Sequence, residues 1–299
     1  MLLVSWQLVR ASVEAWIDDY AASMGAALAY YTTFSLAPLL IIVIAVAGLA
    51  FDREAARAEI AAQIAGLVGP DGAKAVEALL VSAGRPATSL LAAIVGTATL
   101  ALGATSVVVE LQAALDRIWR APALPPSTGI LGLLRSRILS FGMVIAMGFL
   151  LLVSLVVGAG LSALQNWGVS MFPVGLVALQ ILNLTVGFGV TTLLFAVAYR
   201  VLPRARIAWA DVWIGAAVTA LLFTVGKYLI GLYLGRAGLS SGFGAAGSLV
   251  IILAWVYYSA QVFLLGAEFT WVFAHRHGSL AGTPPPARPV AAAAANASA

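Results

Sequence analysis

Long apolar stretches separated by short polar connections dominate the sequence. A helix needs about 20 apolar residues to cross a hydrocarbon core about 30 Å thick. The pattern predicts about six transmembrane helices, at residues 26–50, 88–109, 138–161, 175–199, 212–234 and 246–273. Ionisable residues are rare within these stretches and lie mostly near their ends. We therefore expect an all-α protein, a polytopic integral membrane helix bundle occupying residues 26–275.

Residues 1–25 follow a different pattern, in which apolar residues recur at three- and four-residue steps. This spacing places them along one stripe of a helix. The stripe contains Leu2, Trp6, Val9, Val13, Trp16 and Tyr20. We expect an amphipathic helix at the inner membrane surface, with its aromatic rings at headgroup level. An ordinary helix packed on the bundle fits the same pattern equally well.

Two other segments differ from the spans. Residues 51–87 are alanine-rich and contain the turn signal Gly69-Pro70-Asp71-Gly72, which favours a helical hairpin on the outer side. Residues 276–299 contain a triple proline and an alanine run. That composition predicts a disordered cytoplasmic tail.

The composition supports a membrane location. Hydrophobic residues make up 62% of the chain and charged residues 9%, and the mean hydropathy is +1.03. Soluble domains carry about 25% charged residues, so lipid must solvate most of this surface. The chain has no cysteine, which excludes a disulfide framework, a thiolate nucleophile and a Cys-ligated metal.

Basic residues in short connections predict the orientation, because they are enriched on the cytoplasmic side. With a cytoplasmic amino terminus, five basic residues lie outside: Arg53, Arg57, Lys74, Arg85 and Arg236. Ten lie inside: Arg10, Arg117, Arg120, Arg135, Arg137, Arg200, Arg204, Arg206, Arg276 and Arg288. Both termini are therefore predicted to be cytoplasmic.

Ionisable residues within spans are functional candidates, because a charge buried in lipid is costly. Lys227 either faces an internal cavity or snorkels to the outer surface. Glu268, near the inner end of the sixth span, is a candidate to pair with Arg200 or a neighbouring arginine; Glu110 is another. Lys227 and Glu268 are expected at different depths, so they are not paired.

A polar stripe and a proline complete the candidate set. Gln180, Asn183, Gly187 and Thr191 share one face of the fourth span. Such residues either hold helices together or line a polar path. Pro38 removes a backbone hydrogen bond within the first span. It produces either a plain kink or the kind of broken helix that marks substrate sites in many transporters.

Other motifs carry less chemistry. His275 and His277 supply two potential metal ligands, whereas a catalytic metal is usually held by three protein ligands. No metal or cofactor is therefore expected. The run Gly242–Gly247 matches a dinucleotide fingerprint but lacks the preceding strand. Gly231 and Gly235 permit close helix packing and leave a homo-oligomer open. We expect no enzyme and no nucleic-acid partner; the expected partners are the lipid bilayer and a small-molecule solute.

Several stretches taken together resemble the YihY/BrkB family of bacterial inner-membrane proteins. They are Gly25–Pro38, Leu115–Trp119, Leu202–Arg206 and the closing run Gly226–Phe269. The resemblance covers about residues 20–275 and implies a multi-pass protein of the bacterial cytoplasmic membrane. Members of the family also carry a label as a tRNA-processing ribonuclease and some a link to virulence. No catalytic cluster in this sequence supports the ribonuclease label.

The sequence leaves two main functional hypotheses and gives no support to a third, a membrane-bound tRNA-processing ribonuclease. The first is a transporter or exporter of a small or amphiphilic solute, based on Pro38, the fourth-span stripe and Lys227. The second is a non-transporting envelope-integrity or scaffold protein, in which the same polar residues hold helices together. A water-accessible pocket favours the first hypothesis, and a dry, self-satisfied bundle favours the second.

Overall fold

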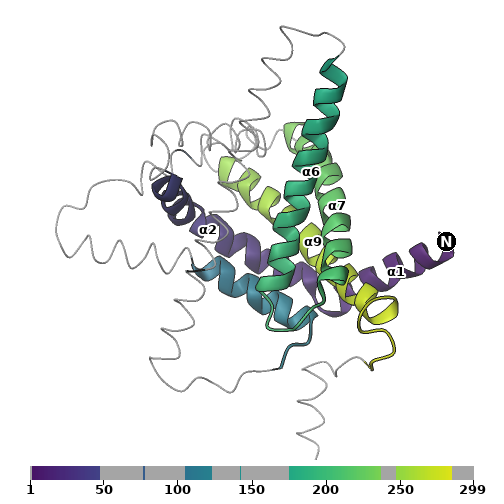
Figure 1. Ribbon diagram of the computed structural model, residues 1–299. Coiled ribbons are helices and arrows are strands. Elements are labelled where there is room, and N and C mark those ends of the chain that lie inside the picture. Colours follow the sequence, from purple (N-terminus) through teal and green to yellow (C-terminus); the bar gives the residue numbers. More distant parts are fainter. Residues whose placement is uncertain are drawn as a thin grey trace, which may run out of the picture.

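The computed structural model describes residues 2–47, 105–122, 175–236 and 247–284, and the single residues 77 and 142 (Figure 1). These contain five long helices: α1 (Leu2–Asp18), α2 (Ala21–Ala47), α6 (Gly175–Val201), α7 (Trp209–Arg236) and α9 (Gly247–Arg276). Residues 105–118 are also helical. Within the described ranges the chain forms no strand, and the all-α prediction is confirmed.

Three helices are long and apolar enough to cross a membrane. Their apolar portions are Leu184–Val201, Trp209–Ile230 and Leu249–Arg276, which correspond to the fourth, fifth and sixth predicted spans. The helix α2 begins five residues before the first predicted span (26–50) and overlaps it over residues 26–47. Most of the second and third spans, and the predicted hairpin at 51–87 apart from the helical residue Glu77, lie outside the described residues.

Glycines allow α7 and α9 to pack closely in antiparallel order. A Cβ added at Gly215 would overlap Thr270, and one added at Gly266 would overlap Thr219. A Cβ added at Gly226 would likewise overlap the Tyr258 hydroxyl. Small residues let helices in a membrane approach closely. We call this set of three glycine–hydroxyl contacts the α7–α9 seam.

Tyr199 joins α6 to this seam. Its hydroxyl donates to the Phe263 carbonyl at 2.7 Å and lies 3.0 Å from Thr219 Oγ1, which itself donates to the Gly215 carbonyl at 2.7 Å. The two hydroxyls carry two protons, so they make two of these three hydrogen bonds at any one time, within one buried polar cluster. Tyr199 is fully buried and belongs to the largest apolar cluster of the bundle.

Segments that the sequence predicts to be cytoplasmic meet at one end of the bundle. Arg204 donates its backbone N–H to Asp116 at 2.8 Å, and Gln112 donates to the Leu202 carbonyl at 3.0 Å. Ser279 Oγ donates to Asp211 at 2.5 Å. Residues 277–284, which the sequence placed in the tail, therefore form turns attached to α7; residues 285–299 lie outside the described residues.

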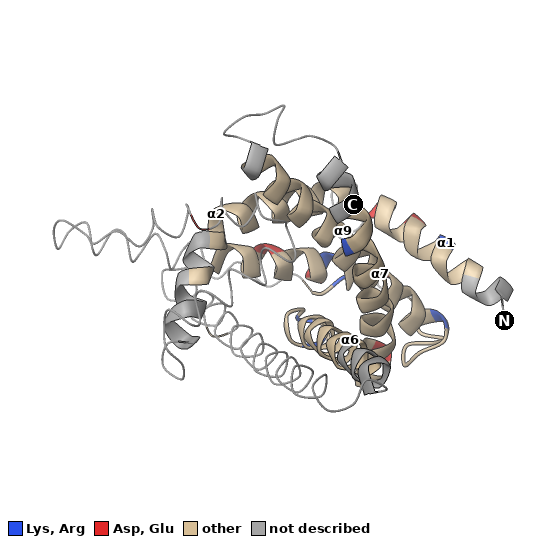
Figure 2. Cartoon of the chain, turned by 90° about the horizontal axis from the view of Figure 1, so that it is seen from above, with Lys and Arg blue, Asp and Glu red and all other residues tan. Residues whose placement is uncertain are grey.

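The helix α1 lies across this end, and Figures 1 and 2 show it running crosswise to α6. One face of α1, carrying Leu8 and Ala15, packs on Val272 of α9. Of the predicted apolar stripe, Trp6, Val9 and Val13 stay exposed, whereas Trp16 packs against the main apolar cluster. Contact between that stripe and lipid remains a prediction.

A charged pocket as candidate functional site

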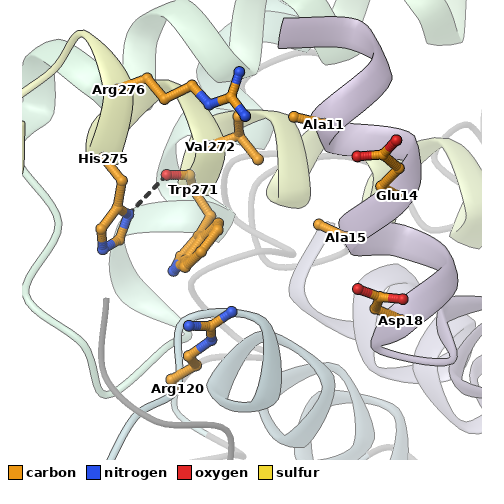
Figure 3. Close-up of a pocket in the computed structure, with 9 residues that line it drawn as sticks. All are labelled: Ala11, Glu14, Ala15, Asp18, Arg120, Trp271, Val272, His275 and Arg276. Atoms are coloured by element: carbon orange, nitrogen blue, oxygen red, sulfur yellow. Dashed lines mark hydrogen bonds between the residues drawn. The ribbon is translucent and has the colours of Figure 1, made fainter. Parts of the chain in front are cut away.

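A pocket of about 380 Å³ opens where α1, Arg120 and the end of α9 meet. Its charged side chains come from three separate segments of the chain (Figure 3). The lining residues are Ala11, Glu14, Ala15, Asp18, Arg120, Trp271, Val272, His275 and Arg276. We call this the charged pocket. It lies at the end of the bundle that the sequence predicts to be cytoplasmic.

The acidic side of the pocket comes from α1. Glu14 and Asp18 are four residues apart, so they lie on the same helical face, and both are exposed. Figure 3 shows their carboxylates projecting from α1 toward α9. Glu14 also accepts a 2.7 Å hydrogen bond from Arg10 Nε. That bond raises the pKa of the Arg10 guanidinium.

The basic side comes from Arg120 and Arg276. Arg120 has a φ of 49°, in the left-handed region that costs a non-glycine residue about 1–2 kcal/mol. It ends the helix at 105–118, where Ala121 N–H donates to the Asp116 carbonyl at 2.8 Å, as in a Schellman motif. Its guanidinium stacks 4.3 Å from the Trp271 ring centroid. The backbone therefore directs this cation onto an aromatic floor.

Trp271 and His275 form that floor on consecutive turns of α9. Their ring centroids are 4.4 Å apart, and His275 Nδ1 lies 2.9 Å from the Trp271 carbonyl oxygen (Figure 3). The Trp271 indole Nε1 is buried without a hydrogen-bond acceptor among the described residues.

Asp116 fixes the helix that carries Arg120 to the connection before α7. Its Oδ2 lies 3.4 Å from Arg204 Nη1, beside the backbone bond described above. Burial raises the pKa of the Asp116 carboxyl, and the hydrogen bond and charge of Arg204 offset part of that rise. Arg120 is thus held at the end of an anchored helix.

Three of the residues predicted to form a polar path have side chains outside the described residues. The helix α2 continues without a break through Pro38, and Gln180 and Asn183 lie within α6. Both interpretations of Pro38, and both of the polar residues on α6, stay predictions.

The remaining candidates, Thr191, Lys227 and Glu268, lie at two different levels along the helix bundle. Thr191 Oγ1 donates to the Gly187 carbonyl of its own helix at 2.8 Å. The helices α6 and α7 run antiparallel, with Tyr199 beside Thr219 and Phe195 beside Phe223 one turn further on. One more turn along both helices places Thr191 level with Lys227. The Lys227 ammonium lies 5.3 Å from the Tyr228 ring centroid.

Glu268 is fully buried in α9, one turn before Trp271 and two turns before His275, both of which line the pocket. Gly226 packs against Tyr258, and Glu268 follows Tyr258 by ten residues, or roughly 15 Å of helix. Lys227 and Glu268 therefore lie at different depths, as predicted. Arg200 Nη1 donates to the Ile207 carbonyl of its own connection.

Sequence reasoning did not group Glu14, Asp18, Arg120 and Trp271. Their signal was a charge or an aromatic ring at the inner end of a helix, which many structural residues share. In the described part of the chain, no cluster of three or more His, Cys, Asp or Glu side chains suited to a metal ion occurs.

Apolar helices of membrane-spanning length, a glycine-packed bundle and a charged pocket at one end define a helical membrane protein. The chain belongs to the family described as Virulence factor BrkB, which it matches over residues 12–291. The resemblance noted in the sequence is thereby confirmed. No solved structure matches the chain.

Curated relatives carry the name UPF0761 membrane protein. One from Pseudomonas aeruginosa is 27% identical over 265 residues, covering 87% of this chain and 61% of the relative. One from Stenotrophomonas maltophilia is 28% identical over 259 residues, covering 85% and 58%. A third, from Rhodospirillum centenum, is 27% identical over 271 residues, covering 88% and 56%. The chain thus spans about three fifths of the length of these relatives.

Proposed function

We propose that this chain is a transporter or exporter of a small or amphiphilic solute. The charged pocket carries this proposal, because it is open and draws opposite charges from three segments. Binding sites of small molecules are concave, with a few convergent polar groups, and the pocket's volume of about 380 Å³ lies in their usual range.

The position of Glu268 supports a route leading from the pocket into the bundle. An ionisable side chain inside a membrane helix commonly marks a solute or proton pathway. Glu268 is buried one helical turn from the pocket floor. In the proposed protein, the pocket is the access site at the predicted cytoplasmic face, and Glu268 is the first charge beyond it.

A non-transporting envelope or scaffold protein is the second candidate, favoured by the α7–α9 seam. There the hydroxyls of Tyr199 and Thr219 each donate to a backbone carbonyl, and their oxygens lie 3.0 Å apart. These polar groups within the bundle satisfy one another and leave nothing for a solute.

The test begins with a thermal-shift screen of detergent-purified protein against lipids, tetrapyrroles, organic anions, drug-like cations and zwitterions. A ligand at a hundredfold excess over its Kd stabilises the folded state by about 2.7 kcal/mol. Any compound that shifts the melting temperature is then followed into proteoliposomes. Saturable uptake that Glu268→Gln or Lys227→Ala reduces supports transport. Absence of uptake for every stabilising compound, or of any stabilising compound, favours the scaffold.

A further inference from the structure

We infer that the connection between α6 and α7 binds the phosphate of an anionic phospholipid at the predicted cytoplasmic surface of the membrane. Two features carry this inference: basic side chains whose charge no carboxylate of the described residues offsets, and exposed indole rings beside them. The residues are Arg200 at the end of α6, Arg206 in the connection, and Trp209 and Trp213 in the first two turns of α7. We call this set the arginine–tryptophan patch. The inference stands apart from the proposed transport of a solute.

Arg200 brings the two ends of the connection together. Its guanidinium donates through Nη1 to the Ile207 carbonyl and lies 5.7 Å from the centroid of the Trp209 ring. These two contacts hold the half-buried side chain beside the residue that follows Arg206. Trp209 and Trp213 stand on consecutive turns, with their ring centroids 6.3 Å apart, and both are exposed. One planar cation and two indole rings therefore adjoin one another at the inner end of α7.

No carboxylate among the described residues offsets the charge of this patch. The carbonyl and the ring that Arg200 contacts are neutral, so they hold the guanidinium in place without cancelling its charge. Arg206 is exposed and, within the part of the chain that the structure describes, forms no ion pair. Its neighbour Arg204 differs, because it pairs with Asp116. Asp211, in the first turn of α7, is buried and accepts hydrogen bonds from Ser279. The patch is therefore positively charged.

A lipid headgroup is the occupant that suits both halves of the patch. Arginine presents paired donors to phosphate oxygens, and basic residues at the cytoplasmic ends of membrane helices attract anionic lipids. Tryptophan is enriched where a span enters the headgroup region. The apolar portion of α7 is Trp209–Ile230, and exposed side chains such as Leu221 and Val225 continue along it. Acyl chains beside this helix place a phosphate at the level of Trp209, whereas a soluble anion makes no use of the exposed rings.

The probes are anionic phosphatidylglycerol, zwitterionic phosphatidylcholine, and glycerophosphoglycerol, which is the anionic headgroup without acyl chains. Each is added to the purified full chain in a neutral detergent, and the rise in melting temperature with its concentration gives an apparent Kd. We expect phosphatidylglycerol to bind at least about fivefold more tightly than phosphatidylcholine, because each arginine near a membrane surface contributes about that factor. Glycerophosphoglycerol should cause no shift. Equal binding of the two lipids overturns the inference, and so does equal binding of the free headgroup, which would make the occupant a soluble anion.

Arginine variants test the charged half of the patch. Arg206→Gln changes an exposed side chain and so keeps the fold; we expect it to weaken phosphatidylglycerol binding about fivefold. Combined with Arg200→Gln, it should weaken binding about 25-fold and abolish the preference over phosphatidylcholine. The matched control is Arg10→Gln, which removes the same charge from an exposed arginine that pairs with Glu14. If this control weakens binding as much as Arg206→Gln, lipid follows the net charge of the chain, and the inference fails.

Tryptophan variants test the apolar half of the patch. Trp213→Ala removes an exposed ring and no charge, so we expect it to weaken the binding of both lipids at least about fivefold. The preference for phosphatidylglycerol should stay unchanged, because both arginines remain. The matched control is Tyr228→Ala, which removes a 68% exposed ring toward the other end of α7. If Trp213→Ala leaves both affinities unchanged, or the control lowers them as much, the rings do not bind lipid and the inference fails.

Discussion

The α7–α9 seam and the charged pocket handle polar groups in opposite ways. In the seam, hydroxyls from Thr219 and Thr270 fit against Gly266 and Gly215 and bond to carbonyls of their own helices at 2.7 Å. In the pocket, charges from three segments surround an open space.

This difference separates packing from binding. A polar side chain whose hydrogen bonds end within the bundle adds cohesion between helices. A polar side chain that faces a cavity keeps donors and acceptors available to a solute. In the sequence, both kinds are isolated polar residues near or within apolar stretches. Only their surroundings in the folded protein distinguish a packing residue from a binding residue.

The largest predicted effect breaks the seam. In Gly266→Ala the new Cβ would overlap Thr219 Oγ1 and approach the Tyr199 hydroxyl to 2.5 Å. We expect a loss of about 1–3 kcal/mol in the free energy of unfolding, measured by denaturant titration in detergent. The matched control is Gly187→Ala, where a Cβ has open space and helix propensity favours alanine by about 1 kcal/mol. Equal stability of the two variants would contradict the close packing.

Tyr199→Phe tests the hydrogen bonds of the seam without changing its shape. It leaves the buried Phe263 carbonyl and Thr219 without the tyrosine hydroxyl, so we expect a cost of about 1–3 kcal/mol. Tyr228→Phe serves as control, because that ring is 68% exposed and its loss should leave the unfolding curve unchanged. If Tyr199→Phe leaves the free energy of unfolding unchanged, the hydroxyl contributes no net stability.

A smaller effect is expected at the pocket, where two substitutions of Arg120 differ only in a methyl group. Both remove the cation stacked on Trp271, but alanine keeps the cost of a φ of 49°. We expect Arg120→Gly to be more stable than Arg120→Ala by about 1 kcal/mol, measured by thermal unfolding. The opposite order would mean that Arg120 is not held in a left-handed backbone.

The smallest effect concerns the anchor of the pocket. Since the pKa of Asp116 is raised from its ordinary value of 3.8, the folded state holds this proton more tightly than the unfolded state. The resulting stability is present at acidic pH and is lost as the pH rises from about 4 through the raised pKa. The asparagine of Asp116→Asn does not ionise, so the melting temperature of this variant should rise relative to that of the wild type between pH 4 and pH 7. If the melting temperature of the wild type rises relative to that of Asp116→Asn instead, pairing of the carboxylate with Arg204 outweighs the cost of its burial.

Part of the candidate site could be foreseen from single residues. Glu268 was singled out because a carboxylate within a membrane helix is costly, and it lies buried near the pocket. Arg120 and Trp271 are 151 positions apart in the chain, and no spacing rule relates two residues on helices that are distant in sequence. Their stacking depends on how those helices pack.

The sequence by itself determined that the chain is helical, that its helices are apolar enough for lipid, and which connections share one end. These properties follow from local composition and periodicity, because a bilayer forces backbone hydrogen bonds to close within each helix. Only the tertiary structure decided which polar residues pack and which line a pocket. That choice depends on the register between helices: a glycine facing a hydroxyl closes the seam, whereas charged side chains from three segments around an open space leave a pocket.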